Sequence, residues 1–134
     1  MDPQETKEKY LKYQIIQKKY EELYKQNEEL EAQKEEFTIT IKAINEVLDI
    51  KKTSKILTPL SPGIFIPATL DKEDTFLINV GQGVVVKKNG NEAKKIITNH
   101  INSINEMIQK NKNEMMEFDK QFLELQKELE GENV

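Results

Sequence analysis

The sequence contains no cysteine, no tryptophan and no arginine, so all 20 of its basic residues are lysines. The missing cysteines exclude disulfide bonds, thiolate metal ligands and catalysis through a thiol. The missing arginines weigh against a site for phosphate or guanine, because the guanidinium fork is the preferred group for such contacts. The one histidine, His100, precedes an apolar helical position, and no serine nucleophile is placed to accompany it. We therefore expect no catalytic residue, no cofactor site and no metal site, and we expect the chain not to be an enzyme.

Two further classes of partner are disfavoured by what the sequence lacks. No hydrophobic run approaches the length of a membrane span, and the first ten residues are polar, without the apolar core of a secretory signal. The 24 acidic residues outnumber the lysines and give a net charge of −4. The lysines are not interleaved with aromatic residues that would stack on bases. These features predict a cytoplasmic protein without a membrane or nucleic-acid partner.

Most of the chain has the pattern of a coiled coil. Charged residues make up 33% of the sequence and hydrophobic residues 37%, which suits an elongated protein better than a globule. Asp2 and Pro3 suit a helix start, and the spacing predicts a first helix over residues 3–53 and a second over residues 92–130. Each keeps one heptad register with few polar interruptions. The seam positions of the first helix are Tyr13, Ile16, Tyr20, Leu23, Asn27, Leu30, Lys34, Phe37, Ile41, Ile44 and Leu48, and those of the second are Ile97, Ile101, Ile104, Ile108, Asn111, Met115, Phe118, Phe122, Leu125 and Leu129.

The stretch between the helices, residues 56–88, has the composition of strands. β-Branched and aromatic residues dominate it, and clusters of Gly, Pro and Asp interrupt it at hairpin spacing. We predict four strands, Ile56–Leu60, Ile64–Leu70, Thr75–Val80 and Gly83–Lys88, which form two hairpins. The middle two are apolar on both faces, and some thirty residues are too few to enclose a core. The hairpins are therefore predicted to assemble with other subunits through Ile56, Leu57, Leu60, Ile64, Phe65, Ile66, Phe76, Ile78, Val80, Val84 and Val86.

The two helices are expected to fold back on each other as an antiparallel coiled coil. The fold class is then α+β and mainly α, with residues 1–134 as one domain. An alignment that places Asn27 beside Asn111 leaves two alternatives open. The two amides bond to each other and fix the register, or each faces solvent at a loosened seam.

Three motifs in the central stretch resemble one family. They are Leu57-Thr58-Pro59-Leu60, Ile64-Phe65-Ile66-Pro67 and the run from Val80 to Lys88, VGQGVVVKK. Together with the flanking heptad helices, they resemble α-class prefoldin subunits, which include the archaeal α subunit and the eukaryotic subunit 5. The β class has a single hairpin, so the second hairpin favours the α class. Ala68 departs from the glycine that is usual after Pro67, and this change affects only the strand surface.

The resemblance implies an ATP-independent co-chaperone. Two α-class and four β-class subunits would join their hairpins into a β-barrel body and deliver unfolded client proteins to a group II chaperonin. Clients would be held at the helix ends, where we expect the seam to splay. The expected contacts are Tyr10, Tyr13, Ile16, Tyr20, Phe118, Phe122, Leu125 and Leu129, although ordinary seam packing accounts for the same residues. The alternative function is a homo-oligomeric coiled-coil scaffold or filament assembled through the same hairpins.

Overall fold

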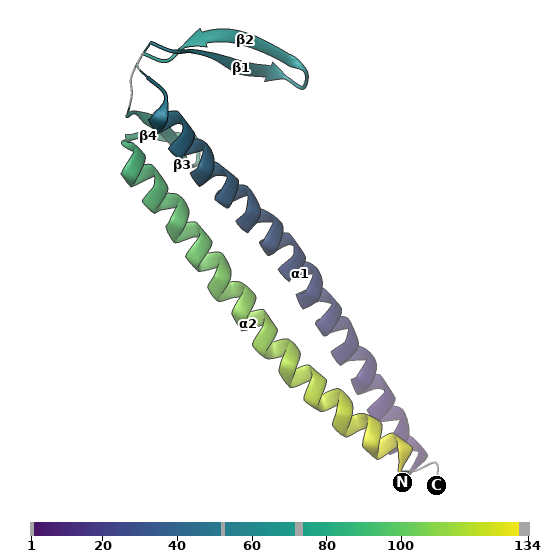
Figure 1. Ribbon diagram of the computed structural model, residues 1–134. Coiled ribbons are helices and arrows are strands. Elements are labelled where there is room, and N and C mark those ends of the chain that lie inside the picture. Colours follow the sequence, from purple (N-terminus) through teal and green to yellow (C-terminus); the bar gives the residue numbers. More distant parts are fainter. Residues whose placement is uncertain (1, 52, 72–73, 132–134) are drawn as a thin grey trace. The chain divides into compact units, whose positions relative to one another are not determined.

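The structure is a computed structural model that describes residues 2–51, 53–71 and 74–131. Along the chain, four strands lie between two long helices (Figure 1). These elements are α1 (Pro3–Asp49), β1 (Lys55–Ser61), β2 (Ile64–Thr69), β3 (Phe76–Gly81), β4 (Val84–Lys88) and α2 (Gly90–Glu130). The strands form two antiparallel pairs, β1 with β2 and β3 with β4. The predicted class, mainly α with two hairpins, is confirmed. Lys52 at the predicted end of the first helix and the predicted turn residues Lys72 and Glu73 lie outside the described residues.

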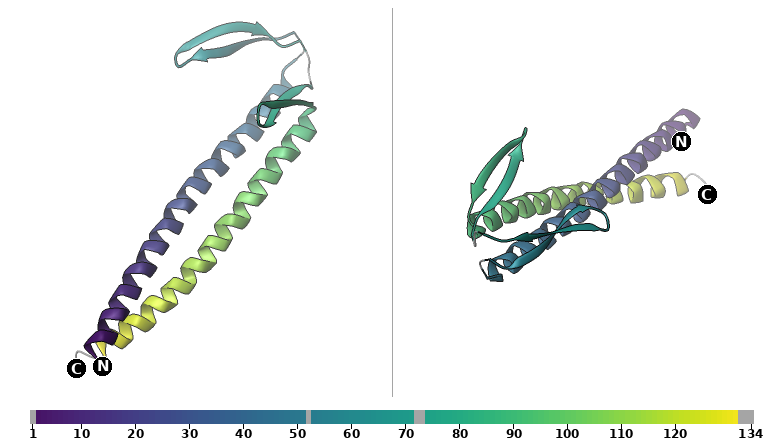
Figure 2. Two further views of the ribbon diagram at one scale, coloured as in Figure 1. Left: turned by 180° about the vertical axis from the view of Figure 1, so that it is seen from behind. Right: turned by 90° about the horizontal axis from the view of Figure 1, so that it is seen from above.

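The chain divides into two compact units, and the first contains Met1–Lys34 and Asn102–Val134. In this unit α1 and α2 lie side by side and run in opposite directions (Figures 1 and 2). The buried residues follow the predicted seam: Ile16, Leu30, Ile104, Ile108 and Leu125. Most of the remaining helix surface is charged or polar and exposed, so the periodic apolar stripe is what holds the two helices together.

The second unit, Glu35–Ile101, contains the end of α1, both hairpins and the start of α2. Its buried apolar residues include Ile44 and Ala93, which is only 1% exposed. Across the helices, the Lys94 ammonium donates to the Asn45 side-chain oxygen at 3.0 Å. The His100 ring stacks on Phe37, with 5.3 Å between the ring centroids and 10° between the planes. His100 thus lies beside the seam, exposed to solvent, with its ring stacked on Phe37.

The helix ends are set by local hydrogen bonds. The Asp2 carboxylate accepts from the Gln4 backbone N–H at 3.2 Å, which is the expected cap of α1. The Asn89 side chain caps α2, because its oxygen accepts from the Glu92 N–H at 2.8 Å and its amide donates to the Glu92 carboxylate at 2.7 Å. α2 therefore begins at Gly90, two residues before the predicted start at residue 92.

The first helix ends at Asp49 rather than at residue 53. Thr53 has a φ of 70°, outside the helical region, and its N–H donates to the Leu70 carbonyl at 2.7 Å. The Leu70 N–H donates in turn to the Ser54 carbonyl at 3.0 Å. The backbone groups of Thr53 and Ser54 therefore form hydrogen bonds at the base of the β1–β2 hairpin instead of the bonds that would continue α1.

Candidate functional site

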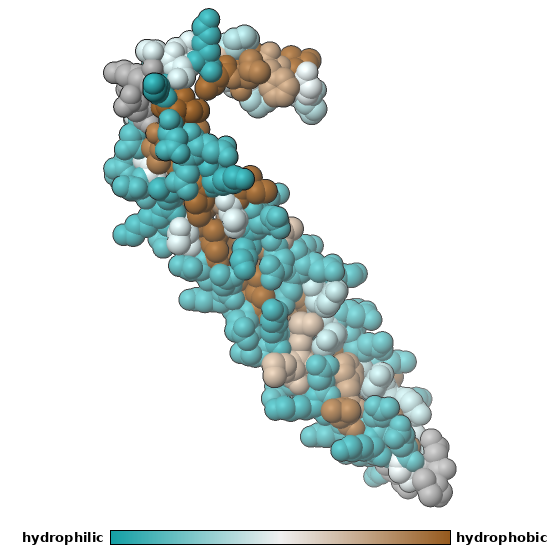
Figure 3. All heavy atoms as spheres, viewed as in Figure 1, coloured by the Kyte–Doolittle hydropathy of each residue, from teal (hydrophilic) through white to brown (hydrophobic). Residues whose placement is uncertain are grey.

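The β1–β2 hairpin exposes apolar side chains on both of its faces. Leu57 pairs with Pro67 and Pro59 with Phe65, so Leu57 and Phe65 share one face. Ile66, which pairs with Thr58, points to the other face. Leu57 is 67% exposed and Phe65 is 55% exposed. Leu60 and Ile64 beside the turn are exposed as well, whereas Ile56 is half-buried. Hydrophobic side chains gather visibly over this hairpin in Figure 3.

The β3–β4 hairpin differs, because one of its faces packs on the helices of its own unit. Ile78 pairs with Val86, and both are half-buried, as is Phe76. A cavity of about 280 Å³ lies between Phe76, Ile78 and the helix residues Ile44, Ala93 and Ile97. The opposite face exposes Leu77 and Val85, which the predicted assembly set did not include. Their alternation with Ile78 and Val86 is the signal that would have found them. Val80 and Val84, near the turn, are also exposed.

The seam is closed at the free end of the first unit. The rings of Tyr13 and Phe122 have centroids 5.0 Å apart, and Tyr20 meets the same ring edge-on at 6.1 Å. Beyond them, the Lys9 ammonium lies 3.0 Å from the Glu128 carboxylate. The two helices are therefore not splayed apart, contrary to our expectation, as far out as the contact between Lys9 and Glu128. Of the predicted client contacts, Ile16 and Leu125 are buried, Tyr10 is exposed, and the others are half-buried: Tyr13, Tyr20, Phe118, Phe122 and Leu129.

The apolar side chains of the first unit that are more than half exposed lie outside the seam. Leu11 and Ile15 of α1 are 51% and 56% exposed, and Leu123 of α2 is 58% exposed. The heptad pattern did not point to them, because it reports only the positions that face the other helix. Their signal in the sequence is an apolar residue at a position where the pattern calls for a charged one.

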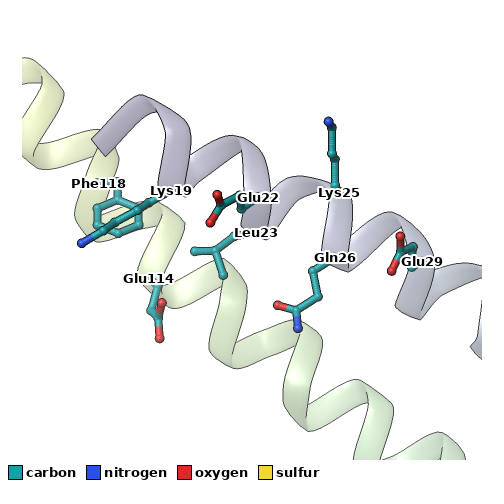
Figure 4. Close-up of a pocket in the computed structure, with 8 residues that line it drawn as sticks. All are labelled: Lys19, Glu22, Leu23, Lys25, Gln26, Glu29, Glu114 and Phe118. Carbon is teal, nitrogen blue, oxygen red and sulfur yellow. The ribbon is translucent and has the colours of Figure 1, made fainter. Parts of the chain in front are cut away.

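A groove of about 480 Å³ follows the helix pair in the first unit (Figure 4). Leu23 points from α1 toward α2, while Lys25 points away from the pair (Figure 4). Among the lining residues are lysines and glutamates, so the groove carries charges of both signs. The residues that line it are Lys19, Glu22, Leu23, Lys25, Gln26, Glu29, Glu114 and Phe118. Within the described ranges there is no cluster of three His, Cys, Asp or Glu residues that would hold a metal ion. Nor does the described part of either helix contain a segment apolar enough to cross a membrane.

A polar layer interrupts the apolar seam of the first unit. The Asn111 amide donates to the side-chain oxygens of Asn27 and Gln26, at 2.9 Å in each case. Asn111 is only 8% exposed. Asn27 lies within 3.5 Å of the Ile108 carbonyl, to which its amide donates. The two asparagines therefore bond to each other, which decides between the two alternatives that the sequence left open.

Replacing both asparagines by leucine (N27L/N111L) is expected to raise the free energy of unfolding by about 1–2 kcal/mol, because a continuous apolar seam replaces a desolvated polar layer. N27L alone is expected to lower it by about 1 kcal/mol, because Asn111 loses an acceptor in a buried position. Urea unfolding of the full chain measures both changes. N105L, the same substitution at an exposed position of α2, is the control. The single variant N111L completes the cycle, and additive effects of N27L and N111L in the double variant would contradict the coupling.

Comparison with known proteins gives a consistent result. The family model described as "Prefoldin subunit" matches residues 16–133. The chain is 21% identical over 75 residues to a protein of Thermofilum pendens named prefoldin subunit alpha. It is 30% identical over 60 residues to prefoldin subunit 5 of Arabidopsis thaliana. The matches cover 56% and 45% of this chain, and only 58% and 40% of those two relatives.

A solved structure shows the same fold. It is the cryo-EM structure of filamentous prefoldin from Methanocaldococcus jannaschii, with a TM-score of 0.77 and 16% sequence identity. The match covers 84% of this chain and 93% of that chain. The family model spans most of the sequence, both named relatives are α-class or subunit 5 proteins, and the two hairpins agree with that class. The chain belongs to the prefoldin family and is an α-like subunit of it.

Proposed function

We propose that the chain is a subunit of an ATP-independent co-chaperone that holds non-native polypeptides and delivers them to a group II chaperonin. The match to the prefoldin subunit model over residues 16–133 carries this proposal. Its partners would be β-class prefoldin subunits, in a ratio of two α-class to four β-class chains, in the cytoplasm. In this proposal the whole chain acts as one prefoldin-like domain.

The exposed apolar faces of the hairpins support the assembly step. Leu57, Leu60 and Phe65 are more than half exposed in the single chain, and an isolated two-stranded hairpin is only marginally stable in water. Covering these side chains with the strands of neighbouring subunits removes apolar surface from water and completes the edges of the hairpins. The hairpins would thus form the body of the particle.

The free end of the helix pair is the proposed client site. Tyr13, Tyr20 and Phe122 are half-buried against one another, so they present part of their rings to solvent. Opening of this end would expose the remaining apolar surface, including Ile16 and Leu125. Aromatic rings with adaptable neighbours suit promiscuous binding of unfolded chains, and Met115 and Met116 supply soft surface nearby.

The second candidate function is a homo-oligomeric scaffold or filament built through the same hairpins. The observation that favours it is the fold match to a prefoldin from Methanocaldococcus jannaschii that is described as filamentous. Both functions require the hairpins to assemble. They differ in whether a β-class partner is needed and whether the particle closes.

Native mass spectrometry of the full chain, with and without a β-class prefoldin subunit from the same source, tests the proposal. We expect a closed six-chain complex that contains two copies of this chain. In a separate aggregation assay, this complex is expected to keep a chemically unfolded protein soluble. A homopolymer that ignores the added subunit would favour the scaffold. A stable monomer in both samples would contradict both functions.

A further inference from the structure

The inference begins with two apolar side chains on the outside of α1. Leu11 is 51% exposed and Ile15 is 56% exposed, whereas the neighbouring seam residue Ile16 is 5% exposed. Leu11 and Ile15 are four residues apart on one helix, so their side chains lie next to each other on its surface, with Cβ atoms about 6 Å apart. We refer to these two residues as the Leu11–Ile15 ridge.

The ridge lies in a basic segment of an otherwise acidic helix. Residues 7–19 contain five lysines and one acidic residue, a net charge of +4, whereas residues 1–50 contain 8 lysines against 12 acidic residues. The lysines of the segment are Lys7, Lys9, Lys12, Lys18 and Lys19, and the acidic residue is Glu8.

Helical spacing brings four of the lysines to the ridge. Lys7 is one turn before Leu11, while Lys12, Lys18 and Lys19 are within one turn of Ile15. Lys9, the fifth, forms a salt bridge with Glu128. In the part of the chain that the structure describes, no salt bridge involves any of the other four. Glu8 lies one helical turn from Lys12, and Glu22 lies one turn from Lys18 and Lys19, but neither forms a salt bridge with these lysines there. The ridge is thus an apolar strip with an excess of ammonium groups around it.

We propose that the Leu11–Ile15 ridge binds non-native polypeptide segments in which a pair of apolar side chains, two residues apart, is flanked on both sides by carboxylates. The inference rests on the proposed function and adds a chemical preference to it. Apolar burial supplies contact energy, and the lysines attract carboxylates and repel basic segments. In an extended chain, every second side chain points the same way at a spacing of about 6.7 Å. This spacing is close to the distance of about 6 Å between the two ridge residues. Carboxylates two residues before and two residues after the apolar pair point to the same side of the peptide, toward the lysines.

An anionic membrane is the other surface that attracts lysines beside apolar residues. A helix that lies in a membrane interface needs a continuous apolar face. Here the larger apolar stripe of α1 is turned toward α2, where Ile16 and Leu30 are buried, and only two residues form the ridge. The exposed apolar area therefore fits a peptide segment better than a lipid surface.

The test uses the assembled full-length protein and two fluorescent, unstructured peptides with the same leucine and phenylalanine residues. One peptide has glutamate two residues before and two residues after each apolar pair, and the other has lysine at the same positions. Fluorescence anisotropy is expected to show at least a tenfold preference for the glutamate peptide, which weakens with salt. The variant L11Q/I15Q is expected to bind the glutamate peptide about tenfold more weakly. The matched control I39Q changes an outward-facing residue that is 59% exposed, and it is expected to bind as the wild type does.

The lysines are tested separately with K12Q/K18Q/K19Q, which is expected to bind both peptides with similar affinity. The inference is overturned if the wild type binds the two peptides equally, or if L11Q/I15Q keeps full affinity for the glutamate peptide. Binding to phosphatidylserine vesicles in place of either peptide would overturn it as well. If any of these results is found and the wild type still keeps an unfolded protein soluble, the proposed co-chaperone function stands without the ridge. If the wild type cannot keep an unfolded protein soluble, the proposed function itself is contradicted.

Discussion

The double variant L57D/F65D is expected to remain a single chain under conditions in which the wild type assembles. Leu57 and Phe65 lie on one face of the β1–β2 hairpin and are 67% and 55% exposed in the isolated chain. If this face is covered in the particle, two carboxylates would be buried there without partners, at a cost of several kcal/mol each. We expect assembly to weaken at least a thousandfold. Size-exclusion chromatography with light scattering measures the mass directly.

The helix pair itself provides the control for this variant. I39D/M107D places the same two charges on exposed apolar residues of α1 and α2, 59% and 46% exposed, and is expected to assemble normally. Far-UV circular dichroism of L57D/F65D should retain the helical signal, because neither substituted residue belongs to α1 or α2. Normal assembly of L57D/F65D would show that this face of the hairpin is not an interface.

The sequence predicted the architecture because period and composition decide it. A heptad register locates the seam, so Ile16, Ile104 and Ile108 were placed correctly on the buried face. The pairing of Asn27 with Asn111 followed from the same register, once the helices were taken as antiparallel. The hairpin turns followed from Gly63, Gly81 and Gly83, which adopt the positive φ values that glycine tolerates.

Contacts that depend on three-dimensional packing were not predictable in the same way. The Gly90 N–H donates to the Asp74 carboxylate, and a methyl group on Gly90 would come within 2.7 Å of the Leu48 side chain. The spacing of residues in the sequence does not reveal that the backbone at Gly90 and the side chain of Leu48 come this close. Likewise, a heptad identifies Tyr13 and Phe122 as seam positions but does not say whether the seam is open or closed around them. The exposed residues Leu11 and Ile15 were not predicted, because a heptad pattern identifies only the helix positions that face the seam.

The closed seam leads to the last prediction, which concerns access to the proposed client site. Tyr13 and Phe122 contact each other, and Leu125 is only 6% exposed, so a client reaches their buried surface only when the two helices separate. Separation would break the Lys9–Glu128 salt bridge and expose apolar surface to water. If the seam residues hold the client, preventing this separation should prevent holding.

The chain has no cysteine, so the variant K9C/E128C carries only two thiols, at positions whose native side chains are 3.0 Å apart. Joining them with a short, reducible cross-linker is expected to lower the capacity to keep an unfolded protein soluble by about tenfold, and reduction of the linker should restore it. The matched control is N45C/K94C, cross-linked in the same way at another interhelical contact of 3.0 Å, which should keep its activity. Binding of the glutamate peptide to the Leu11–Ile15 ridge should survive the cross-link in both variants, because the ridge faces outward. Full client holding by cross-linked K9C/E128C would remove Tyr13, Phe122 and Leu125 from the client site and leave the outer surface of the helices to perform that role.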